Sequence, residues 1–382
     1  VRIWNSDCRE SYKAETIDLL RSGWQGFVIT TPESLSTDRL SSVLTGRINL
    51  AAVDEAHCVL KDRGFRGNYA TLGKTLARLK PSVIMATTAT LSVPDQDALI
   101  QTLRLQQPTR IILPLSRSNL TIKIAERYPG NLATILNNHT GECGIVFCAT
   151  VSTAKSLFST LETQGRSVVL YHGRLPASEK KVAQSQFMSG EREVGIVTDA
   201  FLLGIDKPDL RFTVHWDYPQ SIENWVQGFG RAGRDGLPAT VYGAFRGSMQ
   251  GKQSRQFLVT ATYPHINTIA DVWHDLITVP FCDDSASAIA ERVLGRVGKY
   301  SGGAIMNALK RHGLVKTDPH PDDGRRRRYS ARGNFDQVDW QPYLQERRGS
   351  QQRFEAMCEL SQLPEEKIPA AIDDYFDVES ST

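Results

Sequence analysis

The first candidate for chemistry is a pair of adjacent carboxylates, Asp54 and Glu55, at the end of a short apolar run over residues 50–54. An aspartate at the carboxyl end of a buried strand can hold a magnesium ion, and a neighbouring glutamate can orient a water molecule for attack on a phosphate. His57 completes the tetrapeptide Asp-Glu-Ala-His. Because short motifs also arise by chance, this one alone leaves an ordinary acidic turn between a strand and a loop equally open.

Hydroxyl side chains follow two other predicted strands. Thr88 and Thr90 come after the apolar run of residues 83–87, where their hydroxyls are placed to link two domains. The segment 31–34, Thr-Pro-Glu-Ser, follows an earlier run at residues 27–30. Its backbone and hydroxyl groups can grip a nucleic-acid backbone, which is contacted by such groups in many complexes.

Two arginines, Arg231 and Arg234, lie three residues apart at the end of a predicted helix over residues 221–229. This spacing puts both on one helix face, from which they can reach across a cleft to a γ-phosphate. On its own, a Gly-Arg-x-Gly-Arg segment is more often a solvated basic turn. Its occurrence after Thr198-Asp199 and after Gly-Ile-Asp-Lys-Pro at residues 204–208 makes the combination much more specific.

Short apolar runs alternate with helical patterns over roughly the first 245 residues, which is typical of parallel α/β sheets buried on both faces. A break near residues 114–127 separates two such series and predicts two α/β domains with a cleft between them. Beyond them, three helices and two strands have the outline of a winged helix. The expected strands are residues 27–30, 50–54, 83–87 and 110–113, then 144–149, 167–172, 194–198, 211–216 and 239–245; the later helices are 266–277, 286–294 and 302–312, with strands at 314–318 and 325–331.

Composition describes an ordinary globular protein of 382 residues, 40% of them hydrophobic. Six scattered cysteines without a Cys-x-x-Cys pair and the lack of an apolar signal segment predict a cytoplasmic, reduced setting, and no apolar stretch is long enough for a membrane span. The net charge of +3 hides a basic block at residues 286–335, with eleven basic against four acidic residues, and an acidic tail at 359–382, with seven acids against one lysine.

Taken together, these motifs resemble the RecQ family of superfamily-two DEAH helicases over about the first two thirds of the chain. The Cys after the acidic box and the Gly-Arg-Ala-Gly-Arg-Asp-Gly string favour RecQ over other DEAH groups. The residues that carry the resemblance are Thr31 to Ser34, Asp54 to Cys58, Thr88 to Thr90, Tyr171-His172-Gly173, residues 204–209, residues 221–223 and Gln227 to Gly236.

The resemblance implies an ATP-dependent DNA helicase that moves 3′ to 5′ along single-stranded DNA and separates duplexes, with ATP and Mg²⁺ between two RecA-like domains. The implied domains are residues 1–115 (the later part of the first RecA-like domain), 116–250 (the second), 251–335 (winged-helix-like, gripping the duplex) and 336–382 (a helical acidic tail). The implied roles are Mg²⁺ binding for Asp54, water activation for Glu55, coupling of nucleotide state to domain closure for His57, Thr88, Thr90 and Gln227, sugar contact for Asp206, and arginine fingers for Arg231 and Arg234.

The same resemblance assigns DNA contacts. We expect single-stranded DNA to contact Thr31, Pro32, Glu33, Arg66, Tyr69, His172, Gly173 and Thr198. We expect duplex DNA to contact Lys299, Arg325, Arg326, Arg327 and Arg328, with Lys310 and Arg311 beside the third winged-helix helix. The alternatives are a plain surface loop around Arg66, where the tryptophan of the family's aromatic-rich loop is absent, and a solvated charge run for the arginines.

Two departures from the family pattern matter. No Gly-rich loop with Gly-Lys-Ser/Thr spacing precedes Asp54, and Gly73-Lys74-Thr75 is one residue out of register with Gly67, so we interpret that segment as an ordinary helix. We therefore expect a chain that begins partway into a longer protein and is inactive alone. The segment from Cys358 to Tyr375 resembles the helical part of the family's zinc-binding region without its cysteines, so we expect no zinc.

Two other functions remain open from the sequence. The first is a non-catalytic DNA-binding protein that retains a helicase fold after loss of the phosphate loop, and coding sequence upstream of Val1 would discriminate it from a motor. The second is an RNA-directed helicase, against which Tyr171-His172-Gly173 and the Arg231–Gly236 string argue.

Overall fold

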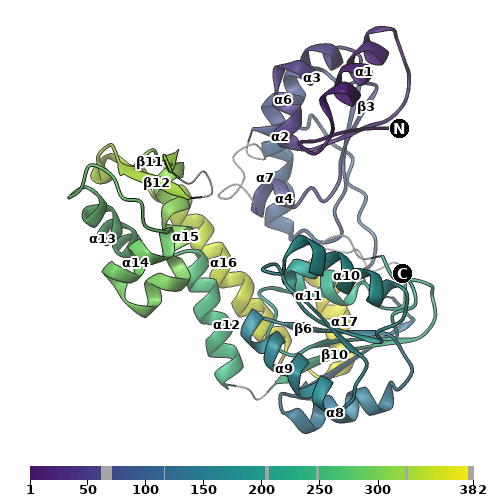
Figure 1. Ribbon diagram of the computed structural model, residues 1–382. Helices are drawn as coiled ribbons and strands as arrows, with labels where there is room; N and C mark the ends of the chain where they lie inside the picture. The colour runs from purple at the N-terminus through teal and green to yellow at the C-terminus, as the bar shows by residue number, and fades with distance from the viewer. Residues whose placement is uncertain (62–70, 116, 203–205, 247–248, 323–325, 377–382) are drawn as a thin grey trace. The chain divides into compact units, whose positions relative to one another are not determined.

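The computed structural model describes residues 1–61, 71–115, 117–202, 206–246, 249–322 and 326–376. The chain divides into two compact units, Val1–Ile112 and Leu113–Thr382, which are described separately below (Figure 1).

The first unit holds two pairs of parallel strands with helices packed against them. Strand β1 (Arg2–Trp4) pairs with β2 (Val28–Thr30), and β3 (Leu50–Val53) pairs with β4 (Val83–Ala86). One core gathers leucines of two helices with Ala56 and Val59. The helices are α1 (Glu10–Arg21), α2 (Pro32–Leu35), α3 (Asp38–Leu44), α4 (Cys58–Lys61), α6 (Leu72–Leu79) and α7 (Val93–Leu103).

These strands bury only one face, so the expectation of strands buried on both faces is wrong for this unit. Alternate side chains along β3 and β4 are exposed, with Leu50 at 49% and Val83 at 56% of full exposure. Ile29 on β2 is 59% exposed. The runs consist of apolar residues throughout, and composition cannot tell whether helices cover one face of a sheet or both.

The predicted strand at residues 110–113 is also wrong. The segment has no regular secondary structure, and Ile111 and Leu113 are 83% and 72% exposed. A run of β-branched residues forms a strand only where a neighbouring strand accepts its backbone hydrogen bonds, and the described residues offer none here.

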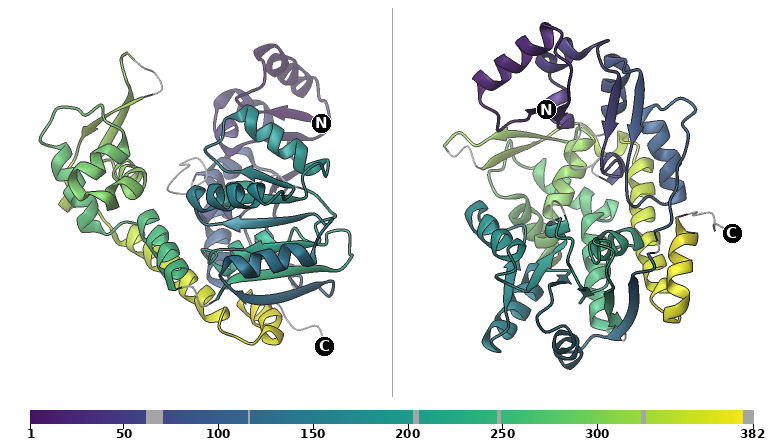
Figure 2. Two further views of the ribbon diagram at one scale, coloured as in Figure 1. Left: turned by 60° about the horizontal axis from the view of Figure 1, so that its bottom comes forward. Right: turned by 90° about the vertical axis from the view of Figure 1, so that its right-hand side faces the viewer.

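The second unit is built on a six-stranded parallel sheet in the order β5-β10-β9-β6-β8-β7. Every residue of the inner strands β6, β8 and β9 is buried, because helices lie on both faces of the sheet (Figure 2). The strands are β5 (Leu120–Glu126), β6 (Gly144–Cys148), β7 (Val168–Tyr171), β8 (Val194–Thr198), β9 (Phe212–His215) and β10 (Ala239–Arg246); the helices are α8 (Pro129–Asn138), α9 (Val151–Thr163), α10 (Ala177–Met188), the 3₁₀ turn η2 (Asp199–Leu202) and α11 (Ile222–Phe229).

Sequence reasoning missed β5, which lies in the stretch 114–127 taken for a break between domains. It is an edge strand, and its residues alternate between exposed and half-buried positions. Such a strand contains polar residues such as Lys123 and Glu126, so it lacks the continuous apolar run by which the inner strands are recognised.

The chain continues into a helical region with an antiparallel hairpin. Helix α15 begins at Arg296 rather than near residue 302, because its glycines serve close packing instead of ending the helix. A Cβ added at Gly298 would lie 2.0 Å from the carbonyl oxygen of Ala290 in the preceding helix. The elements are α12 (Met249–Thr262), α13 (Ile266–Leu276), α14 (Ala286–Leu294), α15 (Arg296–Arg311), β11 (Val315–Pro319) and β12 (Arg327–Ala331).

The last helices return to the sheet. After η3 (Phe335–Gln337), helix α16 (Gln341–Leu360) runs beside α12 (Figure 1), and η4 (Glu365–Lys367) leads into α17 (Ile368–Tyr375). Met357, Ile368 and Ile372 join Trp225 and Phe245 in one buried apolar cluster. The C-terminal helices are thus part of the second unit's core.

A histidine buried in this core makes stability depend on pH. His215 at the end of β9 stacks on Phe147, and burial, with a smaller contribution from Arg255, lowers the pKa of His215 to about 3. In the unfolded chain its pKa is about 6.5, so below that value only the unfolded state takes up the proton.

We therefore expect the free energy of unfolding to be unaffected by His215 above pH 7 and to fall by about 2 kcal/mol between pH 7 and pH 5. Urea titrations at several pH values measure this loss. His215→Gln removes the titrating group, and its pH slope should be smaller than that of the wild type whatever its stability at pH 7. Equal slopes would show that His215 is not the source.

Candidate functional site

The acidic box lies at the carboxyl end of β3 and is tied to the end of β4. The hydroxyl of Thr87 donates to Oδ1 of Asp54 at 2.9 Å, and the backbone N–H of Glu55 donates to the same oxygen at 2.9 Å. The two strands also exchange backbone hydrogen bonds, from Thr87 to Val53 and from Ala56 to Thr87. Glu55 has a φ of 48°, in the left-handed region that non-glycine residues rarely adopt. The side chain of Glu55 is therefore positioned at a conformational cost, which is common at functional sites.

His57 connects the acidic box to the hydroxyl segment. Its buried imidazole places Nδ1 3.0 Å from the hydroxyl of Thr88 and 3.2 Å from a carboxylate oxygen of Glu55. The backbone N–H of Thr90 donates to the Thr88 hydroxyl at 3.4 Å, and the buried Thr90 hydroxyl has no partner among the described residues. Five predicted residues of the first unit are thus brought together.

The carboxylate of Asp54 is suited to bind a magnesium ion. Asp54 is exposed, and both hydrogen bonds given above go to Oδ1, so Oδ2 has no partner among the residues described. Protein-bound Mg²⁺ commonly takes one or two carboxylate ligands and completes its shell with water and phosphate oxygens. Elsewhere in the described chain, no group of three or more His, Cys, Asp or Glu side chains is arranged to hold a metal.

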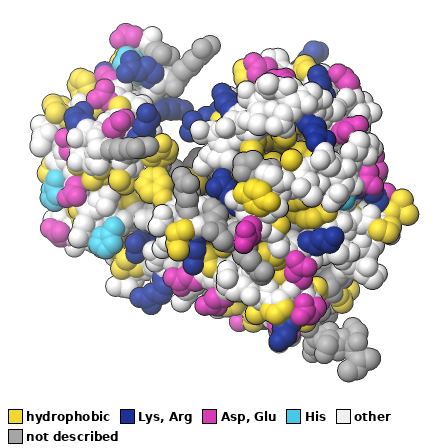
Figure 3. Space-filling view, turned by 90° about the horizontal axis from the view of Figure 1, so that it is seen from below, with side chains coloured by type: hydrophobic (Ala, Val, Ile, Leu, Met, Phe, Trp, Pro, Cys, Tyr) yellow, Lys and Arg dark blue, Asp and Glu magenta, His cyan; other side chains and the backbone are white. Residues whose placement is uncertain are grey.

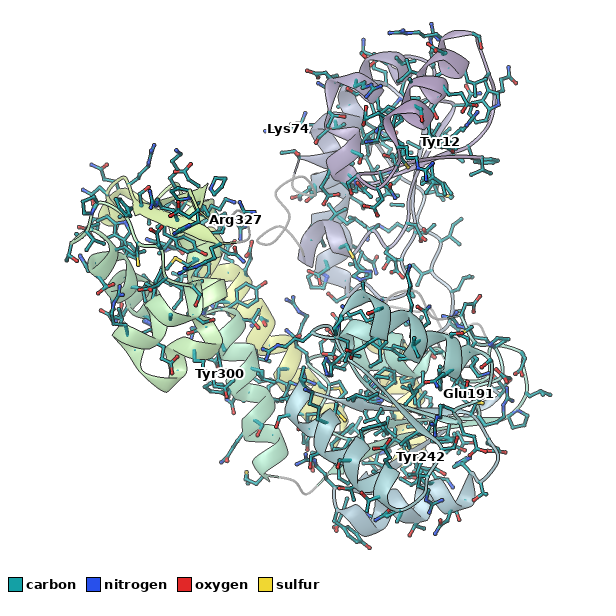
Figure 4. The ribbon with its side chains drawn as sticks, viewed as in Figure 1. Tyr12, Lys74, Glu191, Tyr242, Tyr300 and Arg327 are labelled. Carbon is teal, nitrogen blue, oxygen red and sulfur yellow. The ribbon has the colours of Figure 1, made fainter. Side chains whose placement is uncertain are left out.

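The segment Gly73-Lys74-Thr75 forms part of helix α6, as expected. Gly73 packs so closely on α7 that an added Cβ would lie 2.0 Å from the carbonyl oxygen of Thr102. Lys74 is exposed on the helix (Figure 4). Gly73 therefore serves helix packing.

The other predicted segment of this unit begins helix α2. Thr31 caps this helix by accepting a hydrogen bond from the backbone N–H of Ser34 at 3.3 Å, and Pro32 and Glu33 are the first residues of the helix.

The predicted arginine pair lies in the second unit and is divided between two environments. Helix α11 ends at Phe229, Gln227 is half-buried on it, and Arg231 just beyond is 7% exposed. Arg234 is on the surface, with Nη1 2.7 Å from a carboxylate oxygen of Asp206. These residues were all predicted. Sequence reasoning missed Arg117, whose guanidinium donates to the carbonyl oxygens of Gly230 and Ala232 in the same loop.

A second predicted group lies at the carboxyl ends of adjacent strands β7 and β8. His172 follows β7 and is only 2% exposed, and neither of its ring nitrogens has a hydrogen-bond partner among the described residues. Thr198 ends β8 beside it, since these strands pair. Burial lowers the pKa of His172, and Lys155, Arg174 and Lys180 lower it further. Those three cations were not predicted, although Arg174 and Lys180 follow His172 closely in the sequence and could have been noticed there.

The hairpin arginines differ in how they are held. Arg328 makes two hydrogen bonds to the carboxylate of Asp283, at 2.7 and 2.8 Å, and its guanidinium lies 4.0 Å from the centre of the Phe281 ring. This hydrogen-bonded arginine holds the pKa of Asp283 below its usual value. Arg326 donates to the Asp283 carbonyl, whereas Arg327 is exposed (Figure 4).

The remaining predicted contacts are distributed as follows. Lys299 is exposed on α15, and Lys310 lies in its last turn beside Arg311, which is paired with Glu346. On the face shown in Figure 3, acidic and basic side chains of the described residues are interspersed. Gly173 accepts a hydrogen bond from Lys180. The predicted contacts Arg66, Tyr69 and Arg325 lie outside the described residues.

Comparison with known proteins decides the family. Residues 5–99 match the family described as DEAD/DEAH box helicase, and residues 128–236 match the helicase conserved C-terminal domain. The ATP-dependent DNA helicase RecQ of Bacillus subtilis is 33% identical over 251 residues, which are 64% of this chain and 42% of that protein. RecQ of Pasteurella multocida is 32% identical over 224 residues, 58% of this chain and 35% of the relative. The chain belongs to the RecQ family of superfamily-two helicases.

Membership of the RecQ family confirms the resemblance recognised in the motifs, and two RecA-like domains fit the fold. The structure of the helicase Lhr of Mycobacterium smegmatis, bound to ssDNA and AMP-PNP, matches 86% of this chain and 47% of that one, at 19% identity and a TM-score of 0.50, and so supports the fold alone. The chain spans less than half the length of the RecQ relatives named here. None of its described helices is both long and apolar enough to cross a membrane.

Proposed function

We propose that this chain is the motor part of an ATP-dependent DNA helicase of RecQ type that moves 3′ to 5′ on single-stranded DNA inside the cell. The observation that carries the proposal is the linked cluster at the ends of β3 and β4, in which His57 contacts both Glu55 and Thr88. An acidic turn without a catalytic role would need neither the left-handed backbone of Glu55 nor this buried connection. The proposed domain limits are residues 115, 250 and 335.

In this proposal Asp54 holds Mg²⁺ through its outer carboxylate oxygen, and Mg²⁺ supplies charge neutralisation for the phosphates of bound ATP. Glu55 orients the attacking water. His57 and Thr88 couple movement of Glu55 to the segment that ends at Thr90, because His57 contacts both Glu55 and Thr88, and Thr88 accepts a hydrogen bond from Thr90.

In the second unit, Arg231 and Arg234 supply positive charge to the transferred phosphate, an effect worth roughly 10³–10⁵ in rate in related enzymes. Gln227 couples nucleotide state to domain closure, and Asp206 contacts the sugar. The observed Asp206–Arg234 pair is exposed, and exposed pairs contribute only about 0–1 kcal/mol, so Arg234 leaves it at little cost.

The proposed DNA path includes residues 31–33 of the first unit and the edge formed by His172, Gly173 and Thr198 in the second. The cations Lys155, Arg174 and Lys180 around His172 support this path, because a phosphate backbone is attracted to clustered positive charge. The hairpin with Arg326 and Arg327 is proposed to contact duplex DNA at a junction.

Alone, the 382-residue chain is expected to release no phosphate from ATP above the buffer rate, with or without single-stranded DNA. The reason is that no segment of it provides the Gly-rich loop and lysine that cradle the β- and γ-phosphates. A phosphate-release assay measures this, circular dichroism of the same preparation shows that the protein is folded, and binding of a fluorescent DNA strand is measured separately.

Glu55→Gln is the matched control for that assay, since turnover that survives the substitution comes from a contaminant. Robust DNA-stimulated hydrolysis that disappears in E55Q would contradict the expected inactivity and support the motor function. Absence of DNA binding by the folded chain would contradict the motor function itself.

The alternative function from the sequence is a non-catalytic DNA-binding protein that retains the helicase fold. The upstream coding sequence discriminates the two, because an in-frame strand, Gly-rich loop and lysine are required only for the motor. Comparison of DNA with RNA binding tests the RNA-directed alternative.

A further inference from the structure

The loop after α11 that carries Arg231 and Arg234 is held from a distant part of the chain. Residues 117–119 precede edge strand β5, more than 100 positions earlier in sequence. Nη2 of Arg117 donates to the carbonyl oxygens of Gly230 and Ala232, at 3.2 and 2.7 Å. Nδ2 of Asn119 donates to the carbonyl oxygens of Gly233 and Leu237, at 2.8 and 2.9 Å.

These bonds go to carbonyl groups that have no helix or strand to satisfy them. Gly233 has a φ of +57°, and a Cβ at this position would lie 2.6 Å from Nδ2 of Asn119. Its own N–H donates to the carbonyl of Leu210 at 2.8 Å. The loop is therefore fixed on both sides of Gly233, between the two arginines that the proposed function assigns to the nucleotide.

The charge of Arg117 also acts on this loop. Its guanidinium is half-buried, and burial lowers its pKa, followed by the nearby charge of Arg234. Arginine keeps its proton in proteins, so Arg117 and Arg234 repel each other. Arg117 is anchored by two carbonyls, whereas Arg234 hydrogen-bonds to the carboxylate of Asp206.

We propose that Arg117 and Asn119 are positioning residues that hold the arginine loop in the geometry needed to receive a phosphate anion. The role of the loop rests on the proposed function. Neither residue touches the nucleotide, and both act through the backbone that carries Arg231 and Arg234.

Hydrogen exchange of the full chain, read on peptides that cover residues 229–237, tests the proposal. Arg117→Ala and Asn119→Ala should each speed exchange of this loop by about 10-fold or more, the factor expected from losing hydrogen bonds of this strength. Arg117→Lys keeps a donor and should restore part of the protection. Arg347→Ala is the matched control, because Arg347 is also a half-buried arginine that donates to a backbone carbonyl, that of Tyr263.

A merely structural role is separated by adding inorganic phosphate, an anion that needs no Gly-rich loop to reach the arginines. The wild type should show added protection of the loop, and R117A should lose most of that added protection. Unchanged exchange in both alanine variants would overturn the positioning role, as would wild-type protection by phosphate in R117A. Absence of phosphate protection in the wild type would instead contradict the proposed function of the arginines, while the phosphate-free exchange still decides whether the loop is held.

Discussion

Replacing both Arg326 and Arg327 by glutamine is expected to weaken the binding of duplex DNA by about 100-fold at 0.05 M salt. Each phosphate contact contributes about 0.9 to the slope of log K against log salt. Loss of two contacts lowers the slope by about 1.8, and the difference in affinity between variant and wild type grows as salt is lowered from 1 M. Fluorescence anisotropy over a series of salt concentrations measures both quantities.

The control variant is R166Q/R192Q, which removes the same charge at the amino ends of β7 and β8. It should keep the wild-type slope within about 0.5 if specific phosphate contacts, and not net charge, are responsible. Arg328→Gln provides a second comparison, because this arginine already makes two hydrogen bonds to Asp283 and is expected to change the slope less than Arg326 and Arg327 do. An unchanged slope in R326Q/R327Q would assign the hairpin arginines to a solvated charge run.

Replacing Trp225 by alanine is expected to lower the free energy of unfolding by about 3–5 kcal/mol, the usual range for a large aromatic side chain removed from a core. Trp225 is completely buried on α11, and its ring contacts Phe229, Phe245 and His215 edge to face. Urea unfolding followed by circular dichroism measures the loss. Because α11 leads directly into the arginine loop, the same variant should also increase hydrogen exchange at residues 229–237.

Trp225→Phe is the matched control. The indole N–H of Trp225 has no hydrogen-bond partner among the described residues, so replacement by phenylalanine removes volume but no hydrogen bond. W225F should therefore lower the free energy of unfolding much less than W225A does. A cost for W225F equal to that of W225A would mean that the shape of the indole ring, and not apolar burial, dominates at this position.

Where residue type alone is enough to identify a helix or strand, the predicted motifs lie on the expected helices and strands. Asp54, Glu55 and His57 follow an apolar strand, and the arginine string follows a helix. Ladder bonds between β3 and β4 then bring Thr88 to His57, which follows from the rule that parallel strands end at the same edge of a sheet. Local pattern and fold agree here, so the site in the first unit could be assembled from sequence.

Other features depend on partners that are distant in sequence. Arg328 was grouped with its three neighbours as a DNA contact, whereas 45 residues upstream Asp283 occupies its guanidinium. Arg117 has no recognisable motif around it, and its importance follows only from the carbonyls of residues 230 and 232. Helix α15 was predicted to begin at residue 302 rather than at Arg296, and the sequence does not show that α14 approaches Gly298 closely enough to exclude a Cβ.

The return of the C-terminal segment to the sheet affects the order in which the protein can fold during synthesis. The backbone N–H of Ile124 on edge strand β5 donates to the carboxylate of Glu365, 241 residues later, and the N–H of Leu115 donates to Asp373, 258 residues later. At about 5–20 residues per second, translation from Ile124 to Glu365 takes roughly 12–48 s. For that interval the strand edge of a nascent chain is open to pairing with other chains. The yield of folded protein should therefore rise when ribosome-associated chaperones protect that edge until the last helices emerge.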